Sequence, residues 1–241
     1  AETGRHWEQQ RYSMVLDREL LRWNGWGRVD VPAPLQGSQE EFVLTELAKR
    51  LGGKLGDRSA PSAISDVTLP DSQLTETARA ALADAVGQDQ VRTDNTERAI
   101  HAAGKSLPDL LRVRGGQLND APDAVVYPAD TQAVAATLRV AREHKLSIVP
   151  FGGGTSVVGG VQPVRGEGQA SVVTLDTTQL SALLQLDKES HTATFQAGVD
   201  GPSLEVVLGA QSYTLGHFPQ SFEHSTLGGW IAARSSGQQS T

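Results

Sequence analysis

Residues 150–160 read Pro-Phe-Gly-Gly-Gly-Thr-Ser-Val-Val-Gly-Gly, and they follow directly on a predicted strand. The consecutive glycines lack Cβ atoms and reach positive φ without strain, so successive backbone N–H groups can converge on one anion. Thr155 and Ser156 add hydroxyl donors. Because the loop contains no basic residue, backbone dipoles would carry the binding of a group such as pyrophosphate. A lone glycine-rich loop is usually a tight structural turn, but the unusual pattern of the whole stretch favours a binding role.

This loop differs from the two standard phosphate-binding loops. A P-loop continues from its glycines into Gly-Lys-Ser or Gly-Lys-Thr, and no lysine follows Gly154. The dinucleotide fingerprint requires a third glycine at the opening of a helix, where this sequence has Val157 and residues that begin helices poorly. The sequence therefore predicts an anion-binding loop of another kind.

The sequence around the loop predicts alternating strands and helices. Residues 123–127 and 146–149 are apolar runs typical of buried strands, and Asp130 is placed to cap a helix over residues 131–144. The short loops of this β-α-β unit predict parallel strands. Asp176 ends another predicted strand and is as consistent with capping a following helix as with contacting a ligand. The further predicted elements are strands over residues 171–175 and 192–196 and a helix over residues 202–208.

The first part of the chain predicts helices separated by irregular segments. Apolar spacing and the residues that begin and end helices predict four of them, over residues 7–23, 39–51, 71–86 and 95–103. Residues 56–70 are rich in Ser, Asp, Pro and Gly and form the best candidate linker. We therefore divide the chain into a helical and irregular region, residues 1–119, and an α+β domain, residues 120–241.

Composition excludes several classes of protein. The chain has 241 residues with 38% hydrophobic residues, enough for a sizeable core. Its net charge of −7 argues against a nucleic-acid-binding protein, which normally carries a basic surface. The absence of cysteine excludes disulfides, thiolate metal sites and cysteinyl-linked cofactors. No apolar run is long enough to span a membrane, and residues 1–10 lack a signal-peptide core. These features fit a cytoplasmic location.

A second polar stretch, residues 216–230, combines histidines, an amide, hydroxyls and aromatic rings before a predicted helix. Ser225 or Thr226 can cap that helix, whose positive end would face an anion or an electron-rich ring. His217 and His224, each taken alone, are typical of a polar surface loop. The other histidines are interpreted as surface or linker residues, namely His6, His101, His144 and His191. No spacing resembles a metal site, and neither Ser221 nor Ser225 lies in a nucleophile elbow.

A family resemblance rests on six stretches: residues 22–27 (RWNGWG), 104–110 (GKSLPDL), 121–126 (APDAVV), 150–160, 198–205 and 214–241. Together they resemble the flavoproteins of the vanillyl-alcohol oxidase / p-cresol methylhydroxylase superfamily. Within it, the chain is similar to the alkyldihydroxyacetonephosphate synthases and their bacterial relatives. The resemblance is weakest over residues 28–93. It implies an α+β fold with a p-cresol methylhydroxylase (PCMH)-type FAD-binding domain, incomplete at its C-terminus and preceded by a mainly helical N-terminal region.

The resemblance also implies roles for individual residues. The FAD pyrophosphate would be held by Pro150, Phe151, Gly152, Gly153, Gly154, Thr155 and Ser156. The ribityl and isoalloxazine parts would be lined by Gln220, Ser221, Phe222, Glu223, His224, Ser225 and Thr226, and the same side would be completed by Ala233, Arg234, Ser235 and Ser236. Relatives carry Thr at Ala233, and some carry Asp at Gln220. Some superfamily members attach FAD through a histidine in the loop where this chain has Thr155, so we expect non-covalent FAD.

For the synthases, the resemblance implies an exchange reaction without net redox change. In the family mechanism acyl-dihydroxyacetone phosphate forms a covalent adduct at flavin N5, its acyl group leaves as a fatty acid, and a fatty alcohol replaces it in ether-lipid synthesis. Two alternatives stay open. An FAD-linked 2-hydroxyacid oxidoreductase of the D-lactate or glycolate type would remove hydride from its substrate, and a binding module would keep the fold without catalysis.

The family pattern continues beyond Thr241 into the rest of the FAD domain and a substrate-binding cap domain. The family's catalytic Tyr and His-rich loop lie there, so no catalytic residue is assigned in residues 1–241, and none is assigned to a metal. We expect these residues alone to be inactive. We expect the full-length protein to be a homodimer acting on a lipid substrate, with peripheral membrane contact open, since residues 7–26 are as consistent with core packing as with a membrane surface.

Overall fold

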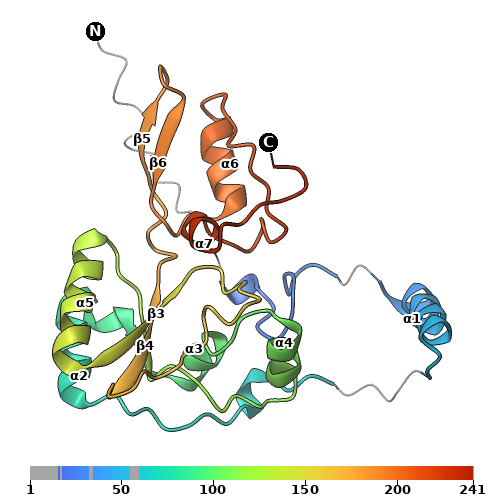
Figure 1. Cartoon of the computed structure of the whole chain (residues 1–241), viewed down its shortest axis with the longest axis horizontal. Helices are drawn as coiled ribbons and strands as arrows, with labels where there is room; N and C mark the ends of the chain where they lie inside the picture. The colour runs from blue at the N-terminus through green and yellow to red at the C-terminus, as the bar shows by residue number, and fades with distance from the viewer. Residues whose placement is uncertain (1–15, 17, 33–34, 55–59, 241) are drawn as a thin grey trace.

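The computed structural model describes residues 16, 18–32, 35–54 and 60–240. It has two main parts that are visible in Figure 1. One is built on a mixed four-stranded sheet, with helices on both faces. The other, drawn above it, contains a two-stranded sheet and two helices. The chain passes from the first part into the second after strand β4 (Ser171–Asp176).

The larger sheet has the strand order β1-β2-β4-β3, with β1 (Val91–Arg92), β2 (Ala124–Val126) and β3 (Leu146–Phe151) around β4. Both β2 and β3 pair with β4 in parallel, whereas β1 pairs with β2 in the antiparallel sense. The predicted β-α-β unit is therefore confirmed, with β4 inserted between its two strands. Because the parallel strands all end at one edge, the loop after β3 and the residues after β4 lie next to each other.

Local sequence signals explain the helix of this unit. Helix α5 (Thr131–His144) begins where the Asp130 carboxylate accepts a hydrogen bond from the backbone N–H of Ala133, 2.7 Å away. It ends at Lys145, which adopts a left-handed conformation with φ of 53°. Both boundaries agree with the prediction for this helix.

Helices α5 and α2 (Glu76–Val86) cover one face of the sheet, on the left in Figure 1. They bury one apolar core against the strands, formed by Ala78, Leu82, Val91, Ala124, Val126, Ala141, Leu146, Val173 and Leu175. Alternate residues of β2 and β4 point into this core, as the two-residue repeat of a strand requires. The intervening residues of β4, including Thr174 and Asp176, face the opposite side and are also fully buried.

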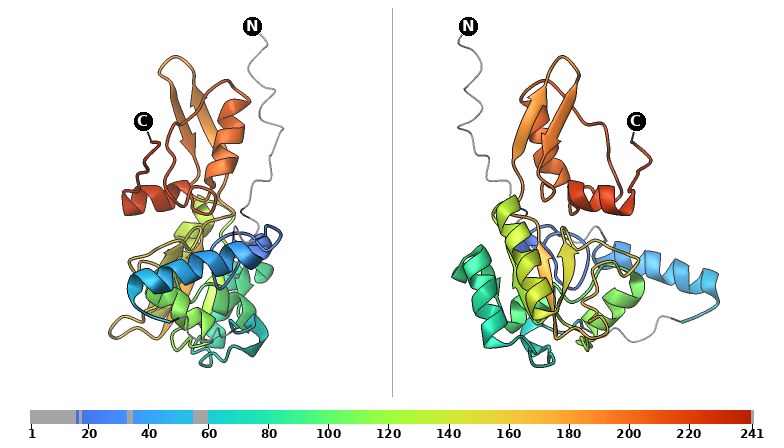
Figure 2. Two further views of the ribbon diagram at one scale, coloured as in Figure 1. Left: turned by 90° about the vertical axis from the view of Figure 1, so that its right-hand side faces the viewer. Right: turned by 60° about the vertical axis from the view of Figure 1, so that its left-hand side comes forward.

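The opposite face carries the short helices α3 (Asn95–Ile100) and α4 (Leu107–Arg114) and the 3-10 helix η3 (Ile64–Asp66). A second apolar cluster lies here, made of Val67, Ala99, Ala102, Ala103, Val113 and Leu118, with Trp23 packed against it. The motif at residues 22–27 is thus folded onto the main body. In contrast, helix α1 (Gly37–Leu51) has no buried residue and projects away from the body (Figure 2).

The second part contains strands β5 (Leu183–Asp187) and β6 (Thr192–Phe195) and helices α6 (Gly201–Gly209) and α7 (Leu227–Ala233), which lie together in both views of Figure 2. Its core is formed by Val199, Leu204, Leu208 and Trp230. Asp200 caps α6. Thr226 caps α7, and it is one of the two residues, Ser225 and Thr226, that the sequence predicts as its cap. Strand β5 was not predicted.

Several predicted boundaries are wrong for reasons visible in the structure. Of the helix predicted over residues 7–23, residues 1–15 and 17 lie outside the described residues. The 3-10 helix η2 (Arg18–Leu20) is followed by a bridge between Leu21 and Arg28, so no α-helix runs to Trp23. Helix α2 begins at Glu76 and not at residue 71, because the N–H of Gln73 is bound by the carboxylate of Asp123 instead.

Three further boundaries are corrected. Helix α1 begins at Gly37 after Gln36, without a side-chain cap from the predicted Ser38. Helix α3 ends at Ile100 and not at residue 103, and Asp94 caps it. No helix follows Asp176, whose carboxylate is committed to other partners described below. Residues 55–59 of the predicted linker lie outside the described residues, while residues 64–66 form η3 and Val67 is buried.

Among the described helices, none is both long and apolar enough to cross a membrane.

Core packing between α2 and the sheet gives a direct test of this fold. Leu82 is fully buried, so Leu82→Ala removes apolar contacts and leaves a cavity, which should lower the free energy of unfolding by about 2–5 kcal/mol in chemical denaturation. Leu138→Ala on the neighbouring helix α5 is the matched control, because Leu138 is 49% exposed. Equal losses for the two variants would contradict the packing described here.

Candidate functional site

The glycine loop and the second polar stretch meet at the edge where β3 ends. A Cβ atom added to Gly153 would lie 1.7 Å from the carbonyl oxygen of His224, and one added to Gly152 would lie 2.2 Å from the hydroxyl oxygen of Thr226. These separations are far shorter than a van der Waals contact, so only glycine permits the two segments to approach this closely. The structure therefore brings together two stretches about 70 residues apart in sequence.

The loop offers free donors to a ligand. Among the described residues, the backbone N–H groups of Gly153, Gly154 and Thr155 have no hydrogen-bond partner. Gly154 has φ of 70°, a left-handed conformation that glycine adopts without strain. Successive N–H groups around a residue in this conformation can form a concave donor set for an anion, and the sequence predicts such a set in this loop.

Ser156 plays a different part from its neighbours. Its hydroxyl accepts hydrogen bonds from the N–H groups of Val158 and Gly160, and its carbonyl accepts one from the N–H of Lys105 at 2.7 Å. A Cβ at Gly104 would lie 2.2 Å from that same carbonyl oxygen. Ser156 thus closes the loop and fixes it to the segment before α4.

A cavity of about 310 Å³ lies beside the loop. Gly153, Gly154, Thr155 and His224 line one side, and the 22–27 turn with its tryptophans Trp23 and Trp26 lines another. Apolar side chains supply most of the remaining wall, together with the cationic residues Arg18, Arg22 and Lys105. The cavity therefore combines flat apolar surfaces with positive charge and unpaired N–H donors, a composition suited to an anionic ligand with an aromatic ring.

Lys105 joins the two sides of this cavity. Its ammonium donates hydrogen bonds to the carbonyls of Arg22 and Trp23, at 3.0 and 3.1 Å, and so fixes the 22–27 turn. Burial, and to a smaller extent the nearby positive charge of Arg18, together lower the pKa of Lys105 to about 8. A bound anion would oppose this shift, because it would stabilise the protonated ammonium.

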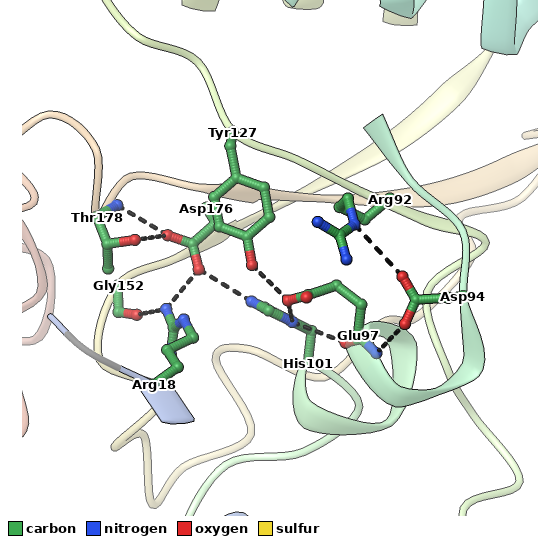
Figure 3. A network of polar contacts seen from close by, with 9 residues as sticks. All are labelled: Arg18, Arg92, Asp94, Glu97, His101, Tyr127, Gly152, Asp176 and Thr178. Carbon is green, nitrogen blue, oxygen red and sulfur yellow. Dashed lines mark hydrogen bonds and ion pairs between the residues drawn. The ribbon is translucent and has the colours of Figure 1, made fainter. Parts of the chain in front are cut away.

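Beneath the loop lies a buried polar network around Asp176 (Figure 3). The Asp176 carboxylate pairs with Arg18, contacts Nε2 of His101 at 2.9 Å and accepts a hydrogen bond from the N–H of Thr178 at 2.8 Å. Although its burial opposes ionisation, the charges of Arg18 and His101 and these hydrogen bonds hold the pKa of Asp176 below its ordinary value. Asp176 is therefore a buried carboxylate with a partner on each side.

The network continues from His101 to the surface of α3. His101 is fully buried, its Nδ1 lies 2.8 Å from the carbonyl oxygen of Glu97, and the Glu97 carboxylate is bonded to the Tyr127 hydroxyl. The interpretation of His101 as a surface or linker residue is thus wrong. Its ring lies 4.5 Å, centroid to centroid, from that of Phe151, the residue before the glycines.

The residues predicted in the second stretch fall into two groups. His224 lines the cavity, and burial together with the charges of Lys105 and Arg28 lowers the pKa of its imidazole despite the opposing charge of Glu223. Its Nδ1 is buried without a hydrogen-bond partner among the described residues. By contrast, the Phe222 ring stacks on that of Trp230 at 6.0 Å, inside the core of the second part.

The other predicted residues of this group lie at or near the two ends of helix α7. The Ser225 hydroxyl accepts a hydrogen bond from the indole of Trp230 at 2.6 Å, and the Thr226 hydroxyl caps the helix. Arg234 adopts φ of 51° at the end of α7, which turns the chain back. Of residues 220–226 and 233–236, His224 lines the cavity and the other ten lie outside its wall.

Sequence reasoning missed Arg18, His101, Lys105 and Trp26 as site residues, and it left Asp176 open between capping a helix and contacting a ligand. Lys105 and Trp26 lie in motifs that carried the family resemblance, so that signal was available. Arg18 and His101 lie in no recognised motif. Among the described residues, no group of three or more metal-binding side chains is present.

Comparison with known proteins places the chain among flavoproteins. Residues 122–241 match the family described as "FAD binding domain". The chain is 34% identical over 94% of its length to an alkyldihydroxyacetonephosphate synthase of Trypanosoma brucei brucei, of which it covers 40%. A solved alkyldihydroxyacetonephosphate synthase structure superposes with a TM-score of 0.80 at 34% identity, covering 92% of this chain and 44% of that one.

A shorter match, 34% identical over 50% of the chain, is to a glycolate oxidase subunit of Bacillus subtilis, of which it covers 25%. The chain thus spans well under half the length of each of these relatives. The α+β fold with an FAD-binding domain, expected from the resemblance, is confirmed by the family and structural matches.

The lowered pKa of Lys105 predicts a pH-dependent stability. Between about pH 8 and the ordinary lysine pKa of 10.5, the unfolded chain still binds the proton that the folded chain has released. The free energy of unfolding should therefore rise with pH in this window, relative to that of Lys105→Met. Chemical denaturation of both proteins from about pH 7 to about pH 10 measures the difference.

Lys188→Met is the control, since Lys188 lies in the exposed turn between β5 and β6. Its stability difference from the wild type should change less over the same range. A constant or shrinking stability advantage of wild type over Lys105→Met would contradict the buried, destabilised ammonium.

Proposed function

Because the chain belongs to the family of FAD-binding proteins related to the alkyldihydroxyacetonephosphate synthases, we propose that it serves a FAD-dependent synthase reaction. In this reaction the acyl group of acyl-dihydroxyacetone phosphate leaves as a fatty acid, and a fatty alcohol supplies the alkyl group that replaces it. The observation that carries the proposal is the match to a synthase along 94% of the chain. That match includes the 22–27 turn and Lys105, which precede the FAD-binding domain and line the cavity.

The residues around the cavity fit FAD. The unpaired N–H groups of Gly153, Gly154 and Thr155 suit the pyrophosphate, and Lys105 adds positive charge close to them. The tryptophans of the 22–27 turn offer flat surfaces for a ring. We assign pyrophosphate binding to residues 150–156. We assign the ribityl and isoalloxazine contacts to residues 220–226, with residues 233–236 on the same side.

Bound FAD would supply a ring able to accept electrons, while this chain would bind and orient it. The neutral loop donors hold an anion without a counter-charge of their own, and Lys105 can stabilise it further. We propose that FAD is held non-covalently, since Thr155 has no nucleophilic imidazole to form a link. The catalytic groups that move protons in the reaction are not assigned within residues 1–241.

An FAD-linked 2-hydroxyacid oxidoreductase is the second candidate. It is favoured by the match to the glycolate oxidase subunit, which shares the FAD-binding region. That match covers half of this chain, whereas the synthase match extends through nearly all of it. We therefore rank the synthase first.

The remaining proposals concern the substrate, the oligomeric state and the subcellular location. We propose a small-molecule or lipid substrate, a homodimer for the full-length protein, and a cytoplasmic location. Within the described part of the 7–26 stretch, Trp23 packs on an apolar cluster and Trp26 lines the cavity. These contacts support the core-packing interpretation of this stretch over the membrane-surface one.

The close approach at Gly153 gives a test of the cofactor site. Gly153→Ala places a Cβ against the His224 carbonyl, so the loop must move and FAD affinity should fall at least tenfold, measured by fluorescence titration of the apo-protein. Gly53→Ala is the control, because a Cβ there meets no atom within 4 Å. Unchanged FAD affinity in Gly153→Ala would contradict the assignment of the loop.

Substrate assays of the full-length protein separate the two activities. The synthase proposal predicts incorporation of a labelled fatty alcohol into the product with acyl-dihydroxyacetone phosphate, and no bleaching of the flavin absorption by D-lactate or glycolate. Rapid bleaching by either hydroxyacid, without alkyl exchange, would replace the first proposal with the second.

A further inference from the structure

Arg18 reaches the glycine loop from a distant part of the sequence. It precedes the FAD-binding domain by about a hundred residues, yet its guanidinium donates to the carbonyl of Gly152 and pairs with Asp176 (Figure 3). The guanidinium carbon also lies 4.9 Å from the centre of the Phe151 ring. The Arg18 side chain is only 13% exposed. One side chain thus contacts both residues at the start of the loop and the carboxylate at the end of β4.

The Asp176 carboxylate, which accepts a hydrogen bond from Arg18, is itself fixed by other contacts. The Asp176 side chain is fully buried, and one of its oxygens bonds both the N–H and the hydroxyl of Thr178. The other oxygen receives Arg18 and His101. Since every direction of the carboxylate is occupied, Asp176 cannot follow a displaced loop without breaking contacts inside the protein.

The contact with the Gly152 carbonyl has a geometric consequence for the loop. In a planar trans peptide, the C=O of one residue and the N–H of the next point in opposite directions. A guanidinium that holds the Gly152 carbonyl therefore directs the N–H of Gly153 away from Arg18. That N–H is one of the unpaired donors of the loop.

Phe151 also contacts two members of this network. Arg18 lies over its ring, and the His101 ring lies 4.5 Å from it. A Cβ added to Gly154 would approach the same ring to 2.6 Å, so the glycines are folded back directly onto Phe151. The conformation of the loop is thus supported by the Arg18, His101 and Asp176 network underneath it.

We infer that Arg18 is a positioning residue for the cofactor loop, through which the segment before the FAD-binding domain controls FAD affinity. Arg18 orients the 152–153 peptide and thereby presents the Gly153 donor to the FAD pyrophosphate. This inference rests on the proposed FAD site. A lysine at this position could pair with Asp176, but it lacks the planar fork that serves a carboxylate and a carbonyl at once.

The test compares FAD dissociation constants of full-length apo-protein for wild type, Arg18→Gln, Arg18→Lys and Arg92→Gln. Arg92→Gln is the matched control. Arg92 is part of the network in Figure 3, but its side chain is exposed, and its Nε forms an ion pair with the Asp94 carboxylate at 3.4 Å. We expect the dissociation constant to rise at least tenfold in Arg18→Gln and by a smaller factor in Arg18→Lys. Arg92→Gln should stay within twofold of wild type.

Melting of the apo-proteins separates positioning from general stability. A purely structural role would lower the melting temperature and leave the FAD dissociation constant unchanged when it is measured well below melting. That result in Arg18→Gln would overturn the inference, and if Arg18→Gln does not fold, an unchanged constant in Arg18→Lys would overturn it equally. Failure of the wild type itself to bind FAD would refute the proposed function, and this inference with it.

Discussion

The close contact between Gly153 and the carbonyl of His224 is the constraint on which the site depends. It lets the loop after β3 and the segment before α7 lie against each other, and no larger residue fits there. Residues 153–155 of this loop line the cavity, and their backbone N–H groups have no hydrogen-bond partner among the described residues. The glycines therefore serve two purposes, since they allow the packing and leave the donors available for an anion.

The second support of the loop is electrostatic. Asp176 lies at the end of β4 and gathers Arg18, His101 and Thr178 directly beneath Phe151. A buried carboxylate is tolerated only when its charge is paired and its oxygens are hydrogen-bonded, and both conditions are met here. The parallel strands make this possible, because their carboxyl ends place the loop after β3 and the side chain of Asp176 side by side.

The parts of the fold that could be predicted are those specified by neighbouring residues. Helix α5 follows from Asp130 as its cap and from local apolar spacing, and the loop after β3 was recognisable from its glycines. Helix α2 starts later than predicted because Asp123 takes the N–H of Gln73, which is a tertiary effect. Arg18 and His101 could not be assigned, since they meet Asp176 across 158 and 75 residues of sequence and neither lies in a recognised motif.

The central claim is that the unpaired N–H groups of the glycine loop hold the FAD pyrophosphate. A crystal structure of the full-length protein with bound FAD tests it most directly. The account predicts pyrophosphate oxygens within hydrogen-bond distance of the backbone nitrogens of Gly153, Gly154 and Thr155, with the Gly152 carbonyl still bound by Arg18. A pyrophosphate seated elsewhere, with these three nitrogens facing water, would contradict it.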